Sequence, residues 1–255
     1  MNDPILFVPP VINVIVTGLF AGVIVRQYVT RRRIYQLYWS IALSMAFLAT
    51  LAYIGMIAAQ PTSGTGVLLF RLYYILGGAL MPAWLGLGSI ALVSSPRVTR
   101  ISVSVLTILS VLTAVLILLA EINMTKLSQI AGTPGTGTIQ PGAWLVMTII
   151  LNTLGVVAVV GVALYSGWKL MRRQSSVGDM RTSNVLWANI LILIGALLNA
   201  AAGTLARLLG VQNTFWLIMA VGWIVLFVGV LLANRRSSSS RSSTVPQEAA
   251  QLLKR

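Results

Sequence analysis

The chain has 255 residues, of which 57% are apolar and 9% are charged, whereas soluble domains have roughly 25% charged residues. Lipid is the solvent that accepts this much apolar surface, so the composition indicates an integral membrane protein. The sequence has no Cys and no His, which excludes disulfides, thiolate catalysis, zinc sites and haem ligation by these side chains. It therefore predicts no metal site and no cofactor.

The net charge of +14 does not indicate a nucleic-acid partner. Lys and Arg residues stand in short clusters between long apolar runs, and they form no basic face of a soluble domain. Such clusters are typical of the flanks of membrane spans. They predict contact with anionic lipid headgroups at the cytoplasmic face.

Seven apolar stretches are long enough to cross the membrane as helices, since a span needs about 20 residues to cover about 30 Å of hydrocarbon. Strands are not expected, because an open strand in lipid leaves its backbone polar groups unpaired. The predicted fold is an all-α bundle with one transmembrane domain over residues 1–233. Its spans are 8–29, 35–59, 67–94, 101–120, 143–168, 184–209 and 214–233. The basic, Ser-rich tail over 234–255 is predicted to be disordered.

The basic residues also predict the orientation of the bundle. Fifteen of the 18 Lys and Arg residues fall on one side of the predicted spans, and only Arg71, Lys126 and Arg207 fall on the other. The positive-inside rule then places the N-terminus outside and the C-terminus in the cytoplasm. We expect a multi-pass protein of the plasma (inner) membrane.

Ionisable groups at mid-depth in a span would indicate a functional site, because they are costly in lipid. The sequence contains none, so it offers no buried Lys for a Schiff base, no acid for a proton relay and no catalytic residue. Arg71 and Arg207 lie about one turn from the outer ends of their spans. Two interpretations stay open: both side chains snorkel to the headgroups, or they face an outer recess and bind an anionic group.

The third span is the most irregular, because Pro82 removes a backbone donor near mid-membrane and several glycines surround it. We expect a kink at Pro82. Broken helices of this kind form binding sites in transporters, while a kink that serves only close packing is the alternative. The candidate ligand or partner contacts are Arg71, Tyr74, Gly77, Gly78, Pro82, Trp84, Asn199 and Arg207.

Small residues at four-residue spacing predict seams where helices pack closely. Gly18 and Gly22 form a GxxxG pair in the first span, and Gly195 and Gly203 flank Asn199 in the sixth. Asn side chains within the spans are expected to make interhelical hydrogen bonds.

Two segments carry a resemblance to known proteins. They are RRRIYQLYW at residues 31–39 and RLYYILGGALMPAWLGLGS at 71–89. Together they resemble the early helices of uncharacterised bacterial seven-helix membrane proteins, over about a third of the chain, which implies the fold and no activity. The topology is also similar to that of SWEET-type sugar transporters, with three helices, a linker helix and three more. The Pro-Gln signature of that family is absent, and seven-helix sensor modules of bacterial kinases share the topology too.

The sequence therefore favours a non-enzymatic membrane protein that acts through lipid, through a second membrane protein or through another copy of itself. A small-solute carrier or channel is the first alternative, and a membrane sensor without its own output domain is the second. A carrier should contain a polar cavity that reaches mid-membrane between the first, third, fifth and sixth helices. A partner-binding protein should have a closed core and an apolar groove on its lipid face.

Overall fold

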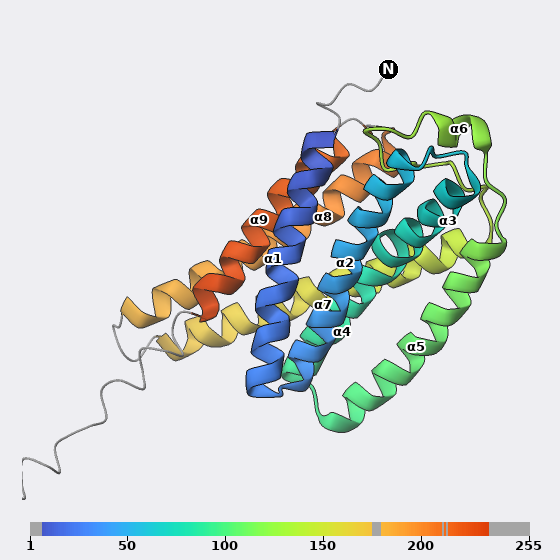
Figure 1. The fold of residues 1–255 in the computed structure, drawn as a ribbon. Helices are drawn as coiled ribbons and strands as arrows, with labels where there is room; N and C mark the ends of the chain where they lie inside the picture. Colours follow the sequence, from blue (N-terminus) through green and yellow to red (C-terminus); the bar gives the residue numbers. More distant parts are fainter. Residues whose placement is uncertain (1–6, 175–179, 211, 213, 235–255) are drawn as a thin grey trace, which may run out of the picture.

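The computed structural model describes residues 7–174, 180–210, 212 and 214–234, and the predicted disordered tail lies almost entirely outside them. Within that part the fold is all-α, with no strand beyond one isolated bridge between Ile122 and Ile139. The elements are α1 (Val8–Arg31), α2 (Ile34–Ala58), α3 (Gly64–Tyr73), η2 (Tyr74–Leu80), α4 (Met81–Val93), α5 (Pro96–Leu119), α6 (Met124–Ser128), α7 (Ala143–Gln174), α8 (Met180–Leu208) and α9 (Phe215–Asn234). Figure 1 shows them in chain order.

Seven of the described helical stretches are long and apolar enough to cross a membrane, which confirms the expected fold class. α3, η2 and α4 together form one of them, Gly64–Val93. The third and fourth spans begin earlier than predicted, at Gly64 and at Pro96. The reason is N-capping, since the side chains of Ser63 and Ser95 accept hydrogen bonds from the first turns of α3 and α5.

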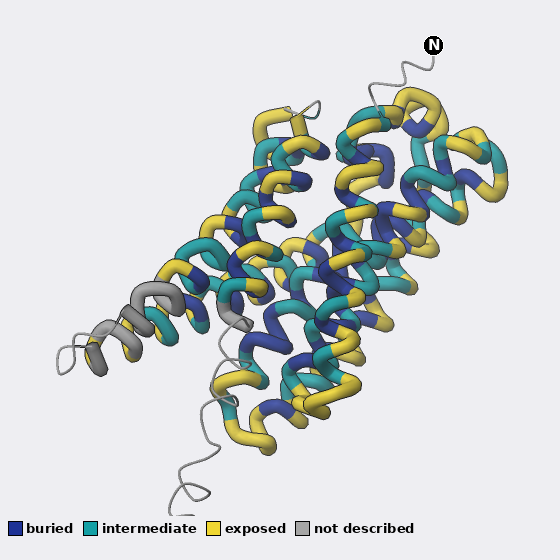
Figure 2. The backbone as a smooth tube through the Cα atoms, turned by 60° about the vertical axis from the view of Figure 1, so that its left-hand side comes forward, coloured by how far each residue is buried: buried dark blue, intermediate teal, exposed yellow. Residues whose placement is uncertain are grey.

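Six of the seven spans form a closed ring. α1 packs on α2, α2 on α4, α4 on α7, α7 on α8, α8 on α9, and α9 returns to α1. α5 lies outside this ring, at the edge of the bundle, where it packs on η2, α4 and α7 (Figure 1). Buried residues follow the inward faces of the helices, and exposed apolar residues cover the outside (Figure 2).

The connector between α5 and α7 folds onto one end of the bundle, which we call the connector end. Backbone hydrogen bonds from Asn123 to Thr138 and from Gln140 to Glu121 close it into a loop around α6. Three aromatic side chains from the spans hold it in place through its carbonyls: Tyr53 Oη donates to Ile130 O (3.1 Å), Tyr73 Oη to Pro134 O (3.2 Å) and Trp216 Nε1 to Thr133 O (3.4 Å). The opposite end, which carries Arg31–Arg33, Arg97 and Arg100 as exposed residues, is the basic end.

Candidate functional site

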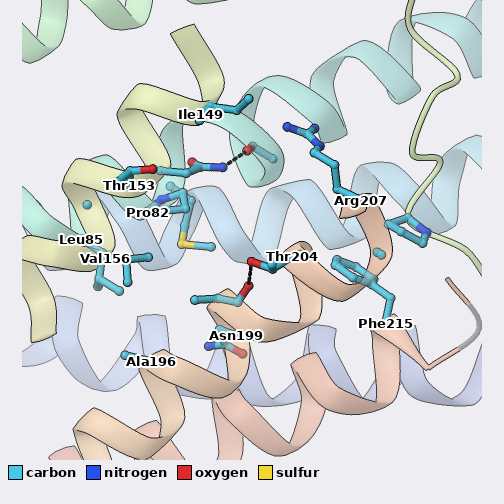
Figure 3. A pocket seen from close by; sticks show the side chains of 18 of the residues that line it. Pro82, Leu85, Ile149, Thr153, Val156, Ala196, Asn199, Thr204, Arg207 and Phe215 are labelled. Carbon is cyan, nitrogen blue, oxygen red and sulfur yellow. Dashed lines mark hydrogen bonds between the residues drawn. The ribbon is translucent and has the colours of Figure 1, made fainter. Parts of the chain in front are cut away.

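A cavity of about 520 Å³ lies inside the ring, between η2 and α4 on one side and α7, α8 and α9 on the others (Figure 3). Its volume is within the range of about 300–1,000 Å³ that is usual for small-ligand sites. The walls are mainly apolar, and the residues that set this character include Met81, Leu85, Val156, Val159, Phe215 and Leu226.

The cavity is elongated along the helices. Its lining runs from Ile149 to Val159 on α7, from Ala196 to Leu208 on α8 and from Phe215 to Leu226 on α9. At 1.5 Å per residue these segments are about 15–18 Å long, which is about half of a 30 Å hydrocarbon core. Pro134 of the connector also lines it, so the cavity extends from the connector end to roughly the middle of the spans.

A buried apolar cluster closes the cavity toward the basic end. Trp223 and Leu226 belong both to the lining of the cavity and to this cluster. Behind them lie the buried side chains of Phe20, Ile24 and Val230. The space is thus a pocket with a floor and does not continue as a passage through the described bundle.

The cavity opens sideways along α7 and α8. Ile149, Thr153 and Val157 line it at four-residue spacing on one face of α7, and all three are exposed. Thr204 and Leu208 do the same on α8. Figure 3 shows Ile149 and Thr153 across from Thr204. A ligand could therefore enter from the surroundings of the spans, which in a membrane are lipid.

Arg207 and Tyr74 form the main polar contact of the cavity, near the connector end. Arg207 Nη2 donates a hydrogen bond of 2.6 Å to Tyr74 Oη, which joins α8 to η2 across the lining. The ring of Tyr74 is itself held edge-on against Trp144, with the ring centroids 5.4 Å apart. Arg207 forms no ion pair within the described residues, where the one acidic side chain is the exposed Glu121.

The irregular wall of the cavity follows from Pro82. Proline has no N–H, so it cannot donate to the carbonyl of Gly78 four residues earlier, and its ring crowds that carbonyl. The chain widens here into the π-helical η2, and Asn152 Nδ2 of α7 donates to Gly78 O at 2.9 Å instead. The sequence predicted a kink at Pro82. In the structure a π-helical stretch lies directly before α4, whose second residue is Pro82.

Five of the eight candidate contact residues line the cavity: Tyr74, Gly78, Pro82, Asn199 and Arg207. The other three do not, and each has a packing or capping role. Arg71 donates to Ile117 O and Ala120 O, both at 3.0 Å, and so caps the C-terminal end of α5. Trp84 Nε1 donates to Ser110 Oγ of α5 at 3.1 Å. A Cβ on Gly77 would lie 2.9 Å from Ala49 Cβ, so Gly77 allows η2 to approach α2.

The structure changes the assignment of Arg71. The sequence left two interpretations open for this side chain, snorkelling to headgroups or binding an anion in a recess. Arg71 instead satisfies two carbonyls at a helix end, where the α-helix has no donors of its own. Arg207 lines the cavity and points to Tyr74.

The predicted packing glycines also divide into two groups. A Cβ on Gly195 would lie 2.6 Å from Leu226 N, and one on Gly18 would lie 3.0 Å from the Phe47 ring, so both are at close helix contacts. Gly22 and Gly203 are exposed and have open space where a Cβ would be, which corrects the packing role predicted for them. Gly203 lines the cavity.

Two features of the site were not predicted from the sequence. For a carrier, a cavity was expected between the first, third, fifth and sixth helices, whereas α9, the seventh span, lines the cavity in place of α1. The hydrogen bond from Asn152 to Gly78 is the second feature. The available signal was the four-residue spacing of Ile149, Thr153 and Val157 beside that Asn, but apolar spans offer many such spacings.

Comparisons with protein-family models, with curated proteins and with solved structures find no match to this chain. The likeness to SWEET-type transporters therefore stays a resemblance of topology.

Proposed function

We propose that this integral membrane protein is non-enzymatic and binds a membrane amphiphile in the cavity between η2–α4 and α7–α9. The observation that carries the proposal is the combination of mainly apolar walls, a lateral opening along α7 and α8, and a closed floor. A polar solute would lose its hydration against such walls without gaining enough partners. An apolar chain loses nothing there, because it exchanges one apolar environment for another.

We also propose an orientation of the protein in the membrane and a contact of its basic end with lipid headgroups. The exposed arginines of the basic end, among them Arg97 and Arg100, support a cytoplasmic position and contact with anionic headgroups of a plasma membrane. The connector end then faces outward. The cavity would be open to the outer leaflet.

The cavity is tested by filling it. Gly203→Phe adds a ring at a lining position where a Cβ meets no heavy atom within 4 Å. Gly161→Phe is the matched control, because Gly161 is also an exposed helical glycine with open space around its Cβ position but does not line the cavity. Binding of palmitate and of monopalmitoylglycerol is measured by native mass spectrometry of the protein in a non-ionic detergent.

We expect the unmodified protein and Gly161→Phe to bind at least one of these amphiphiles, and Gly203→Phe to bind neither. Equal binding by all three proteins would place the lipid elsewhere on the surface. Absence of binding to the unmodified protein would contradict the proposal directly.

A small-solute carrier is the second candidate, and the observation that favours it is the broken helix in the cavity wall. Transporters place discontinuous helices at their substrate sites near the membrane midplane, and η2 with Pro82 occupies such a position. A carrier must open the floor toward the basic end. Single Cys residues at Val159 or Leu226 should then react with an impermeant reagent applied from the basic side, and we expect no reaction if the protein only binds.

A further inference from the structure

The two arginines nearest the connector end differ in how their donors are used. A guanidinium has five N–H groups and always carries a positive charge. Arg71 directs its two terminal nitrogens to two carbonyls of the α5 end and is thereby neutralised locally by a helix C-terminus. Within the described residues, the side chain of Arg207 makes one hydrogen bond, to the neutral hydroxyl of Tyr74. Among these residues most of its donors are therefore free for another group.

Arg207 also has a structural explanation, because it lies in the last turn of α8, where a cation interacts favourably with the helix dipole. That effect alone would direct the guanidinium to the terminal carbonyls of α8. The side chain instead reaches across to η2. The geometry thus positions a half-buried positive charge at the rim of an apolar cavity.

The length of the cavity indicates the length of the ligand's apolar chain. The lining below Arg207 extends about 15–18 Å along α7, α8 and α9, at 1.5 Å per residue. One leaflet of a bilayer occupies about half of the 30 Å hydrocarbon core, so this is the depth that an acyl chain normally covers. With a volume of about 520 Å³ the cavity suits one acyl chain better than the two chains of a phospholipid.

We infer that the cavity selects single-chain amphiphiles with an anionic oxygen head, which Arg207 binds while Tyr74 orients the guanidinium. This inference rests on the proposed function and specifies its ligand class. The head is a carboxylate or a phosphate, since a planar guanidinium pairs with either. The chain lies between Pro82 and Asn199 and ends at the apolar floor.

The experiment compares three amphiphiles with the same C16 chain: palmitate, 1-palmitoyl lysophosphatidate and monopalmitoylglycerol. Affinities are measured on the detergent-purified full chain, on Arg207→Gln and on Tyr74→Phe. Lys126→Gln is the matched control, because it removes one positive charge from an exposed position of the connector outside the cavity. Monopalmitoylglycerol binding also reports whether each variant keeps a folded cavity.

We expect the unmodified protein to bind the anionic amphiphiles roughly ten- to a hundredfold more tightly than the neutral one, as for hydrogen bonds to a charged group. Arg207→Gln should abolish this preference, Tyr74→Phe should reduce it several-fold, and Lys126→Gln should retain it. The ratio of palmitate to lysophosphatidate affinity identifies which head the site accepts better.

Two results would overturn the inference. One is equal affinity of the unmodified protein for palmitate, lysophosphatidate and monopalmitoylglycerol, and the other is an anionic preference that survives in Arg207→Gln. If Gly203→Phe still blocks binding in either case, the proposed function stands and only the head specificity fails. If none of the three amphiphiles binds, the proposed function fails as well.

Discussion

A close contact between two spans offers a sharp test of the packing, because glycines make it. α4 and α7 cross where Gly86 faces Gly155, and a Cβ on Gly86 would lie 2.8 Å from both the Cα and the carbonyl oxygen of Gly155. A Cβ on Gly155 would press on the carbonyl group of Pro82 and lie 2.8 Å from Ala83 N. These neighbours are backbone atoms, so no side chain can move aside. Gly155→Ala must separate the two helices.

The expected change in the free energy of unfolding for Gly155→Ala follows from two opposing effects. Overpacking of a close contact costs about 1–3 kcal/mol, and the rigid backbone neighbours of Gly155 favour the upper part of that range. Ala gains about 1 kcal/mol over Gly in helix propensity. The net expected loss is therefore about 2 kcal/mol for Gly155→Ala. Gly161→Ala on the same helix has open space for its Cβ and should gain up to about 1 kcal/mol.

The assay is unfolding of the purified protein in mixed micelles by increasing SDS, followed by far-UV circular dichroism. The two alanine variants should shift the midpoint in opposite directions, with a difference of about 3 kcal/mol between them. Thermal aggregation by size-exclusion chromatography gives an independent ranking. If Gly155→Ala were as stable as Gly161→Ala, α4 and α7 would not be in backbone contact. The arrangement of these two helices in the wall of the cavity would then be wrong.

Three further predictions test other parts of the structure. A single Cys at Ser128 should react with an impermeant reagent on intact cells, and one at Ser239, outside the described residues, should not; the reverse pattern would contradict the proposed orientation. Asn152→Leu should lower the free energy of unfolding in SDS by about 1 kcal/mol. The loss should be smaller in a Pro82→Ala background, which restores a backbone donor, and an equal loss would show that the two residues act independently. Arg71→Gln should lower the free energy of unfolding by about 1–2 kcal/mol and leave the palmitate affinity unchanged. A loss of affinity would show that Arg71 contributes to ligand binding.

The number and order of the spans could be predicted from sequence because the bilayer imposes a length on each one. A run of about 20 apolar residues has few other options in a chain this poor in charge. The irregularity at Pro82 was predictable for a related reason, since the missing N–H is a property of the residue itself. Its form, a π-helix, was not, because it depends on a donor from Asn152 on another helix.

The candidate site shows where prediction from sequence stops. Arg71 and Arg207 are equivalent in the sequence, each about one turn from the end of a span. One caps α5 and the other meets Tyr74, which is 133 positions away, and only the packing of the ring decides between these partners. The packing partners of glycines are likewise not given by the sequence alone. A GxxxG spacing shows where a neighbour can approach, but Gly22 has no neighbour there, while the isolated Gly155 has one.

The arrangement of contacts indicates how the cavity could change its width. α8 and α9 pack very closely, since Gly195 faces the backbone of Leu226 and Gly229 faces that of Ile192, so they form a rigid pair. This pair packs on α1 and α7, and Trp216 of α9 also contacts Tyr53 and Tyr73, while the cavity lies between the pair and η2 and α4. In the described part, the side-chain hydrogen bond that crosses from the pair to η2 is the one between Arg207 and Tyr74.

An anionic head bound by the free donors of Arg207 would leave the donor that Tyr74 accepts in place. The head would then bind beside the hydrogen bond from α8 to η2, while the acyl chain fills the space between these elements. Binding and the spacing of the α8–α9 pair would thereby be coupled, because a ligand shifts such an equilibrium by its differential affinity for the two spacings. The same coupling would serve a binding protein as a signal to a partner and a carrier as the first step toward opening its floor.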